Sequence, residues 1–183
     1  MGEHRAAVFL DRDGTIIEDR GDLFEPSQVV FFKDTVFSLR RLCERFELFI
    51  VTNQSGVAKG SISMKDVERV NSHVASYLTG RGVPIVATYV CPHERTDNCR
   101  CIKPNPYFLK KAEGDFGIDL RRSFVIGDHP HDVEFAESVG ATGIYVLSGH
   151  GMKHRGELSG TAVVATGIRE AAERVFLCSK TSI

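Results

Sequence analysis

The stretch from Val8 to Thr15 constrains the fold of this chain more than any other. It reads Val-Phe-Leu-Asp-Arg-Asp-Gly-Thr, an apolar run that stops at two carboxylates, Asp11 and Asp13, placed one residue apart. An aspartate at the end of a buried strand is destabilising if it is left unpaired. Asp11 therefore needs a cation or a set of hydrogen-bond donors beside it.

Short runs of β-branched and aromatic residues alternate along the chain with longer stretches of helical period, which is typical of a parallel sheet covered on both faces. The pattern predicts strands near residues 6–11, 47–52, 85–90, 123–127 and 143–147. It predicts helices beginning at Asp34 or Thr35, at Ser63, after Pro106, and over residues 131–139 and 168–177. We therefore expect an α/β fold, a three-layer Rossmann-like parallel sheet flanked by helices.

Composition favours one globular domain over residues 1–183, because 42% of the chain is hydrophobic and 26% is charged. The formal net charge of -1 provides no global field for nucleic acid or an anionic membrane, so neither is an expected partner. No apolar run approaches the roughly 18 to 20 residues that span a bilayer. We expect a cytoplasmic location and a monomer, although the sequence does not report the oligomeric state.

Polar residues follow three of the predicted strands. Asp11 ends the first strand, Thr52 and Asn53 end the second, and Asp128 with Asp132 follows the fourth. In open parallel sheets ligands bind beyond the carboxyl ends of the strands, so these side chains are expected to converge. Carboxylates crowded at one edge repel each other unless a hard divalent cation lies among them, and oxygen ligands favour Mg²⁺. The sequence therefore predicts a magnesium site.

The same residues suit phosphoryl chemistry. One oxygen of Asp11 would remain free to attack phosphorus, and Asp13 could act as general acid and then as general base. Thr52, Asn53 and Lys103 offer a hydroxyl, an amide and a cation to the phosphoryl oxygens. Two alternatives stay open, since Thr52 could satisfy a turn and Asn53 could cap a backbone group.

A second metal site is predicted from the cysteines. Three of the five cysteines, Cys91, Cys99 and Cys101, lie with His93 in the pattern C-x-H-x5-C-x-C. Three thiolates and one imidazole match a closed tetrahedral zinc site, which indicates a structural role in holding the loop over residues 91–102 and hence Lys103. The alternatives are unrelated loop residues or a redox pair of Cys99 and Cys101.

Together these motifs resemble the four motifs of the haloacid dehalogenase (HAD) superfamily, over about residues 6–150. The residues that carry the resemblance are Asp11-Arg12-Asp13-Gly14-Thr15, Thr52, Lys103-Pro104, and Gly127-Asp128 with Asp132. The cysteine loop is similar to that of the branch that holds D-glycero-D-manno-heptose 1,7-bisphosphate phosphatase and histidinol-phosphate phosphatase.

The resemblance implies a role for each matching residue. Asp11 would form an aspartyl-phosphate and Asp13 would be the acid and base. Mg²⁺ would be bound by Asp11, the backbone carbonyl of Asp13, and Asp128, while Asp132 would orient its neighbours. No insertion is long enough for a large cap domain, so we expect a HAD-like fold with short loops around an open site.

Three departures from the branch leave the substrate open. Ile102 stands where heptose bisphosphatases usually carry an arginine, residues 19–25 lack the usual Gly-Tyr pattern, and His129 follows the Gly-Asp pair in place of the commoner lysine. His129 and His131 could contact substrate or cap the next helix. The basic loop of His150, Lys153, His154 and Arg155 suits a solvated face better than a contact to a distal anion.

The leading hypothesis is a Mg²⁺-dependent phosphatase that acts on a small phosphorylated metabolite. A sugar bisphosphate is the favoured substrate, and histidinol phosphate is the alternative. Transfer to an acceptor other than water stays open. A zinc-stabilised binding protein without catalysis is disfavoured by the intact carboxylate set and the lack of net basic charge.

Overall fold

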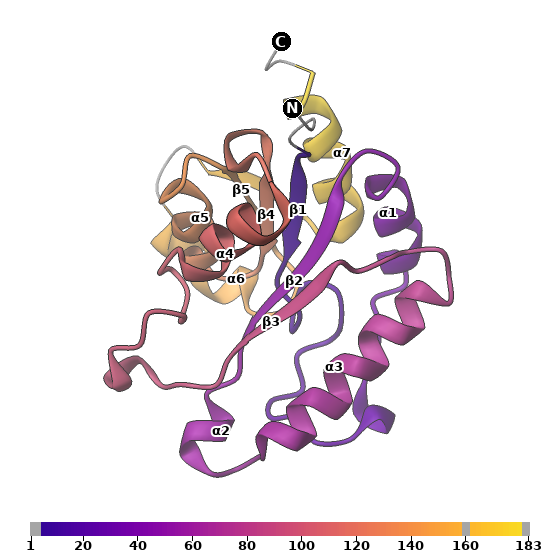
Figure 1. Cartoon of the computed structure of the whole chain (residues 1–183). Helices are drawn as coiled ribbons and strands as arrows, with labels where there is room; N and C mark the ends of the chain where they lie inside the picture. Colours follow the sequence, from indigo (N-terminus) through magenta and orange to yellow (C-terminus); the bar gives the residue numbers. More distant parts are fainter. Residues whose placement is uncertain (1–4, 159–161, 181–183) are drawn as a thin grey trace.

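A computed structural model describes residues 5–158 and 162–180. One six-stranded sheet, all of it parallel, runs through the molecule in the order β3-β2-β1-β4-β5-β6 (Figure 1). The strands are β1 Ala7–Leu10, β2 Glu47–Asn53, β3 Ala87–Cys91, β4 Phe124–Gly127, β5 Thr142–Val146 and β6 Val163–Ala165. Strands β1 and β4 are buried along their whole length, as expected of parallel strands covered on both faces.

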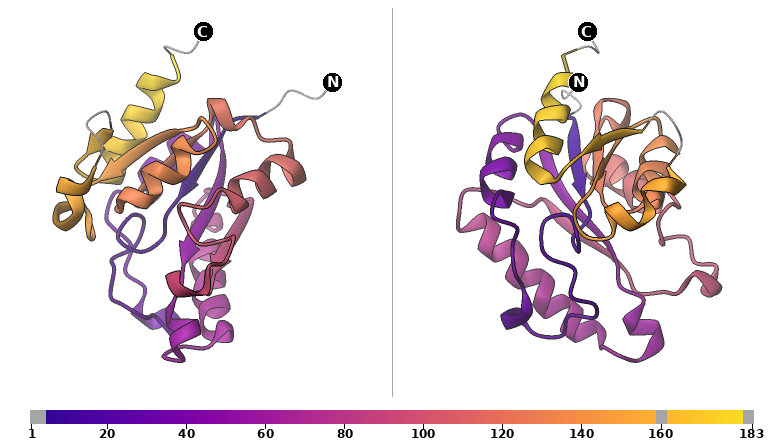
Figure 2. Two further views of the ribbon diagram at one scale, coloured as in Figure 1. Left: turned by 90° about the vertical axis from the view of Figure 1, so that its left-hand side faces the viewer. Right: turned by 180° about the vertical axis from the view of Figure 1, so that it is seen from behind.

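Helices cover both faces of the sheet (Figures 1 and 2). On one face lie α1 (Thr35–Leu42), α3 (Met64–Thr79) and α7 (Ile168–Cys178), packed into one apolar cluster. On the other face lie α4 (Tyr107–Phe116) and α5 (Pro130–Glu137), packed into a second cluster. The predicted three-layer α/β fold is confirmed.

Strand register brings the predicted site residues to one edge. Leu10 of β1 pairs with Ile50 of β2 on one side and Ile126 of β4 on the other. The residues just beyond these positions therefore emerge together at the carboxyl ends of the strands. Because the strand order reverses at β1, this edge is also where ligands bind in such sheets.

Five strands and five long helices were predicted, and their observed ends differ by one or two residues in most cases. Strand β6 was not predicted, because three residues are too few for a periodic signal. Two single-turn helices, α2 (Gly56–Lys59) and α6 (Gly151–His154), were also missed. So were the short 3-10 helices η1 (Pro26–Gln28), η2 (Arg95–Asp97), η3 (Leu120–Arg122) and η4 (Arg155–Glu157).

Among the described residues, no helix has the length and apolar character required to cross a membrane. The expectation of a single domain over residues 1–183 stays a prediction.

Candidate active site

A cavity of about 190 Å³ opens at the carboxyl ends of the strands. All the residues predicted to handle phosphate and magnesium line it, together with several that were not assigned. The lining residues are Asp11, Asp13, Asp19, Thr52, Asn53, Arg95, Lys103, Asp128, His129, His131 and Asp132. The topology thus brings together side chains that are far apart in sequence.

Lys103 lies at the base of the cavity between two carboxylates. Its Nζ donates to Asp11 Oδ1 at 2.5 Å, to Asp132 Oδ1 at 2.6 Å and to the carbonyl of Val51 at 3.2 Å. Burial alone would lower the pKa of Lys103, but the charges of Asp11 and Asp132 outweigh it and raise the pKa. Lys103 is therefore a permanent cation with a fixed position.

Burial raises the pKa of Asp11 well above its ordinary value, and Lys103 opposes that shift. The neighbouring carboxylates of Asp132, Asp128 and Asp13 raise the pKa further. An ionised Asp11 thus depends on positive charge close by, as its place at the end of a buried strand predicts.

Asp13 is held by its neighbour Arg12. Arg12 is fully buried, and its Nε and Nη2 donate to the two carboxylate oxygens of Asp13 at 3.0 and 3.1 Å. The third nitrogen, Nη1, donates to Asn71 Oδ1 of α3 at 2.7 Å. Gln54 adds a further donor, with its Nε2 2.8 Å from Asp13 Oδ2. The candidate acid and base is therefore anchored to α3 through Arg12, and to the segment after β2 through Gln54.

Thr52 and Asn53 line the cavity and also have partners within the protein. Thr52 Oγ1 accepts from Gln54 Nε2 at 2.8 Å and lies 3.4 Å from Asp13 Oδ2. Asn53 Oδ1 accepts from the backbone N–H of Lys103 at 3.3 Å. The backbone-capping role considered for Asn53 is thus present, and its contact with phosphate stays a prediction.

Asp128 is the second carboxylate expected to bind magnesium. Its Oδ2 accepts from the backbone N–H of His150 at 2.7 Å. Two glycines pack against this oxygen, since a Cβ at Gly14 or Gly149 would lie only 2.1 or 2.2 Å from it. Burial raises the pKa of Asp128 to about 6, while the His150 N–H opposes the shift.

The donor set fits a divalent cation. When Asp11, Asp13, Asp128 and Asp132 are all ionised, they exceed the two buried cations beside them, Lys103 and Arg12, by two charges. Among the described residues, three or more carboxylate, thiol or imidazole groups come within 4.8 Å of one another only at the cysteine cluster. Asp11, Asp128 and the backbone carbonyl of Asp13 stay the predicted ligands of Mg²⁺.

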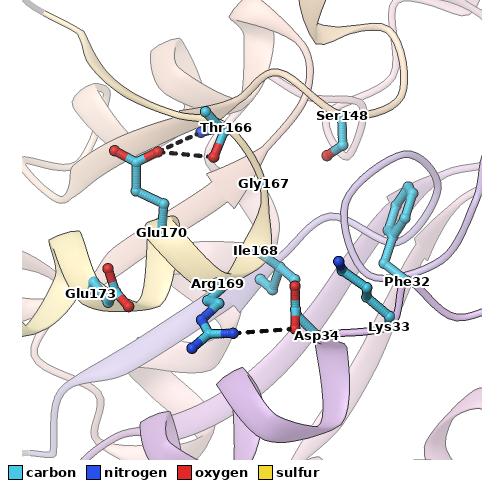
Figure 3. A pocket seen from close by; sticks show the side chains of 10 residues that line it. All are labelled: Phe32, Lys33, Asp34, Ser148, Thr166, Gly167, Ile168, Arg169, Glu170 and Glu173. Atoms are coloured by element: carbon cyan, nitrogen blue, oxygen red, sulfur yellow. Dashed lines mark hydrogen bonds and ion pairs between the residues drawn. The ribbon is translucent and has the colours of Figure 1, made fainter.

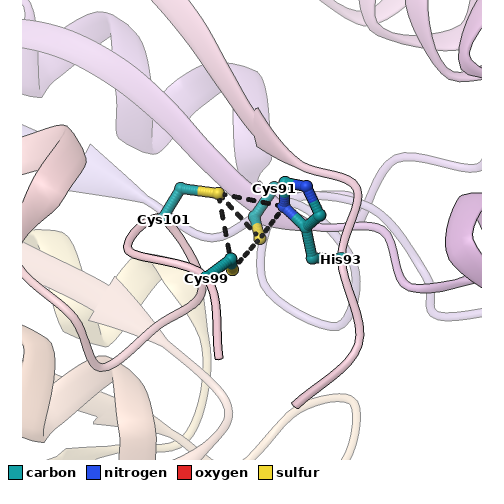
Figure 4. Close-up of side chains that lie close together, drawn as sticks. All are labelled: Cys91, His93, Cys99 and Cys101. Atoms are coloured by element: carbon teal, nitrogen blue, oxygen red, sulfur yellow. Dashed lines mark hydrogen bonds between the residues drawn. The ribbon is translucent and has the colours of Figure 1, made fainter. Parts of the chain in front are cut away.

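The cysteine loop forms a compact cluster (Figure 4). The thiols of Cys91, Cys99 and Cys101 lie 3.2 to 3.6 Å from one another, and His93 Nδ1 lies 3.3 Å from Cys101 Sγ and 3.8 Å from Cys91 Sγ. A tetrahedral ion with metal–sulfur bonds of about 2.3 Å keeps its ligand atoms slightly less than about 4 Å apart. The cluster could therefore hold a metal ion.

The two histidines of uncertain role are both caps and lining residues. His129 is the N-cap of α5, where its Nδ1 accepts from the backbone N–H of His131 at 3.3 Å. Asp132 Oδ2 in turn accepts from the backbone N–H of His129 at 3.1 Å. The predicted basic loop over residues 150–155 contributes no side chain to the cavity lining.

A larger cavity, of about 620 Å³, lies beside the start of α7 (Figure 3). Three of its charged groups have partners within the protein, since Arg169 lies 3.7 Å from Asp34 and Glu170 accepts hydrogen bonds from Thr166. It adjoins the active-site loop through Ser148, whose Oγ donates to the carbonyl of Gly14 at 2.7 Å. None of the residues predicted to bind phosphate or metal lines this cavity.

Two lining residues, Asp19 and Arg95, and three supporting residues, Arg12, Gln54 and Asn71, were not assigned from the sequence. Arg12 and Gln54 stand inside motifs that were recognised, but their roles depend on which way their side chains turn. Arg95 belongs to the cysteine loop, whose path is not set by any periodic pattern. The one signal in the sequence was an arginine between two aspartates directly after an apolar run.

Comparison with known proteins places the chain in a family. A family model described as HAD-hydrolase-like matches residues 100–171. A probable D-glycero-D-manno-heptose-1,7-bisphosphate 7-phosphatase of Thermoplasma acidophilum is 38% identical over 135 residues, which cover 73% of this chain and 84% of the relative. The D-glycero-beta-D-manno-heptose-1,7-bisphosphate 7-phosphatase of Yersinia pestis is 33% identical over 167 residues, covering 86% and 88%.

Solved structures agree on the fold. The D,D-heptose 1,7-bisphosphate phosphatase from B. bronchiseptica, complexed with magnesium and phosphate, superposes with a TM-score of 0.86 at 24% identity, covering 94% of this chain and 98% of that one. A HAD-like phosphatase from Mesorhizobium loti gives 0.74 at 29% identity, covering 79% and 73%.

The fold, the acidic cavity and these relatives together define a phosphatase, a phosphoric monoester hydrolase. The chain belongs to the HAD superfamily, in the family of the heptose-1,7-bisphosphate 7-phosphatases.

Proposed function

We propose that the chain is a Mg²⁺-dependent phosphatase that hydrolyses a phosphomonoester of a small sugar bisphosphate, such as D-glycero-D-manno-heptose 1,7-bisphosphate. The observation that carries the proposal is the placement of Asp11 and Asp13 in one cavity with Lys103. The names of the relatives support the choice of sugar.

In the proposed reaction, one oxygen of Asp11 attacks phosphorus and forms an aspartyl-phosphate as the ester P–O bond breaks. Asp13 donates its proton to the leaving oxygen. Asp13 then takes a proton from water, which attacks the aspartyl-phosphate, restores Asp11 and releases inorganic phosphate. Arg12 and Gln54 keep Asp13 in place for both proton transfers.

Lys103 has two functions in this scheme. Its charge favours the ionised form of Asp11, and it would partly neutralise the incoming phosphoryl oxygens. Asp11, Asp128 and the backbone carbonyl of Asp13 are the proposed magnesium ligands. When bound, Mg²⁺ would screen the repulsion between the nucleophile and the phosphoryl group.

We assign the cysteine cluster to structural zinc. Four protein ligands leave no open position for substrate, so the ion would act on the loop only. The loop leads directly into Lys103, and Asn105 Nδ2 donates to the carbonyl of Cys99 at 3.0 Å, which ties the segment together.

The cytoplasmic location stays a prediction.

A substrate panel tests the proposal. Purified protein with Mg²⁺ is assayed for phosphate release from heptose 1,7-bisphosphate, histidinol phosphate and p-nitrophenyl phosphate, with the Asp11→Asn variant as control. We expect the bisphosphate to have the highest kcat/KM and the variant to be inactive. A kcat/KM for histidinol phosphate about a hundredfold above that for the bisphosphate, a difference of about 2.7 kcal/mol, would overturn the proposed substrate. Unchanged phosphate release by the variant would overturn the mechanism.

A further inference from the structure

Carboxylates outnumber fixed cations in the lining of the active-site cavity. Five carboxylates line it, and its two fixed cations are Lys103 and Arg95. Lys103 is already paired with Asp11 and Asp132. Within residues 5–158 and 162–180, Arg95 has a hydrogen bond to His131 and no carboxylate partner. Arg95 is therefore the lining cation whose charge is still available to a ligand.

The position of Arg95 is set from two sides. It begins η2 within the cysteine loop, and its Nη2 lies 2.8 Å from His131 Nδ1 in the first turn of α5. A guanidinium can only donate hydrogen bonds, so His131 Nδ1 is the acceptor of this contact. The same nitrogen lies 2.6 Å from His129 Nδ1. The contact orients Arg95 without neutralising its charge. The other guanidinium nitrogens keep donors for a further partner.

The size of the cavity places Arg95 where the rest of a substrate must lie. About 190 Å³ is less than the roughly 300 to 1,000 Å³ of typical small-molecule sites. The cavity suits the reacting phosphoryl group, and a sugar attached to it must extend to the mouth. Arg95 is exposed at that mouth. Ile102, which directly precedes Lys103, packs against an apolar cluster and offers no charge there.

We propose that Arg95, oriented by His131, binds the anionic group of the substrate that does not react. The inference rests on the proposed function and makes Arg95 a residue that determines specificity. The ligand class is a phosphomonoester with a second phosphate. A cationic amine at the same distance, as in an amino-alcohol phosphate, is disfavoured by the like charge.

Three substrates and three variants test this. The substrates are heptose 1,7-bisphosphate, heptose 7-phosphate and p-nitrophenyl phosphate, the last two lacking a second phosphate. The Arg95→Ala variant should lose about ten- to a hundredfold more kcat/KM for the bisphosphate than for the other two, mainly through KM, because a charge-assisted contact is lost. The Arg95→Lys variant should recover part of the loss, since it keeps the charge but not the planar fork.

Arg100 provides the matched control. It is an exposed arginine of the same loop that does not line the cavity, so Arg100→Ala should behave as the wild type. Zinc content and melting temperature of each variant check that the loop is intact. Equal losses of kcat/KM on all three substrates in Arg95→Ala, or no more loss than in Arg100→Ala, would overturn this inference alone. A wild-type protein that releases no phosphate from any of the three would overturn the proposed function as well.

Discussion

At the scale of single residues, the site depends on buried charges that balance one another. Lys103 and Arg12 are almost inaccessible to solvent. Lys103 has two carboxylate partners at hydrogen-bond distance and Arg12 has one. Removing one member of such a set leaves an uncompensated charge in a region of low dielectric. The residues proposed to serve the chemistry are therefore expected to contribute to stability as well.

The Lys103→Met variant should be less stable by about 3 to 5 kcal/mol, because Asp11 and Asp132 lose their shared cation. Urea unfolding of the zinc-loaded protein measures the change, and phosphate release should also be lost. Lys110→Met is the matched control, since Lys110 forms only a surface pair with Glu113 and its side chain is 57% exposed. Equal unfolding midpoints for the two variants would contradict the role given to Lys103.

The sequence predicts the positions of the site residues better than it predicts the contacts of their side chains. Strand-end position predicts where Asp11, Thr52 and Asp128 lie, because parallel strands share one edge. It does not predict that Arg12 turns back to hold Asp13, since that depends on the side chain's rotamer and on Asn71 of α3. The amide of Asn53 likewise bonds to the Lys103 backbone, which spacing alone left open.

At the scale of elements, helix α3 illustrates how local signals and packing agree. Ser63 and Asp66 form a reciprocal cap at its start, as their spacing predicts. Val67, Val70 and Val74 then follow on one buried face. Asp34 differs, because it stands at the N-cap of α1 without a side-chain hydrogen bond. The three residues of β6 have no periodic signal, and their place is fixed by pairing with β5 at the edge of the sheet. The single turn α6 is likewise too short for a helical period.

The cap of α3 gives a prediction with a definite pH dependence. Hydrogen bonds from the side chain and backbone N–H of Ser63 lower the pKa of Asp66 from 3.8. A lowered folded-state pKa adds stability that is present above 3.8 and is lost as the pH falls through the folded value. The Ser63→Ala variant should lose about 1 kcal/mol at neutral pH. The difference in free energy of unfolding between the wild type and Ser63→Ala should become smaller in acid.

Urea unfolding across the acid range measures this difference, with Ser76→Ala, an exposed position within the same helix, as control. A difference that stays constant down to pH values below 3.8 would show that Asp66 is not part of the cap.

At the scale of the whole molecule, the two proposed metal sites would have separate tasks. The acidic cavity lies at the edge of the sheet and would need its cation for turnover. The cysteine cluster lies at the end of β3 and in the loop that leads to α4, and its four residues do not line that cavity. The loop has few apolar side chains, so its path could not be derived from hydrophobic periodicity.

Metal removal should separate the two tasks. Chelation followed by Mg²⁺ alone should restore no activity and should leave a lower melting temperature, because zinc binding contributes to folding. Adding zinc and then Mg²⁺ should restore both properties. Cys99→Ser should behave as the zinc-free protein, whereas Cys43→Ser, outside the cluster, should not. Native melting and activity without zinc would contradict the structural role.

The central claim is that Asp11 is the residue that becomes phosphorylated. The protein is quenched in acid during turnover and treated with borohydride, which reduces an aspartyl-phosphate to homoserine. Mass spectrometry of the peptides then locates the homoserine. The account predicts homoserine at position 11 in the wild type and none in Asp11→Asn. Homoserine at another position, or active enzyme with none at position 11, would contradict it.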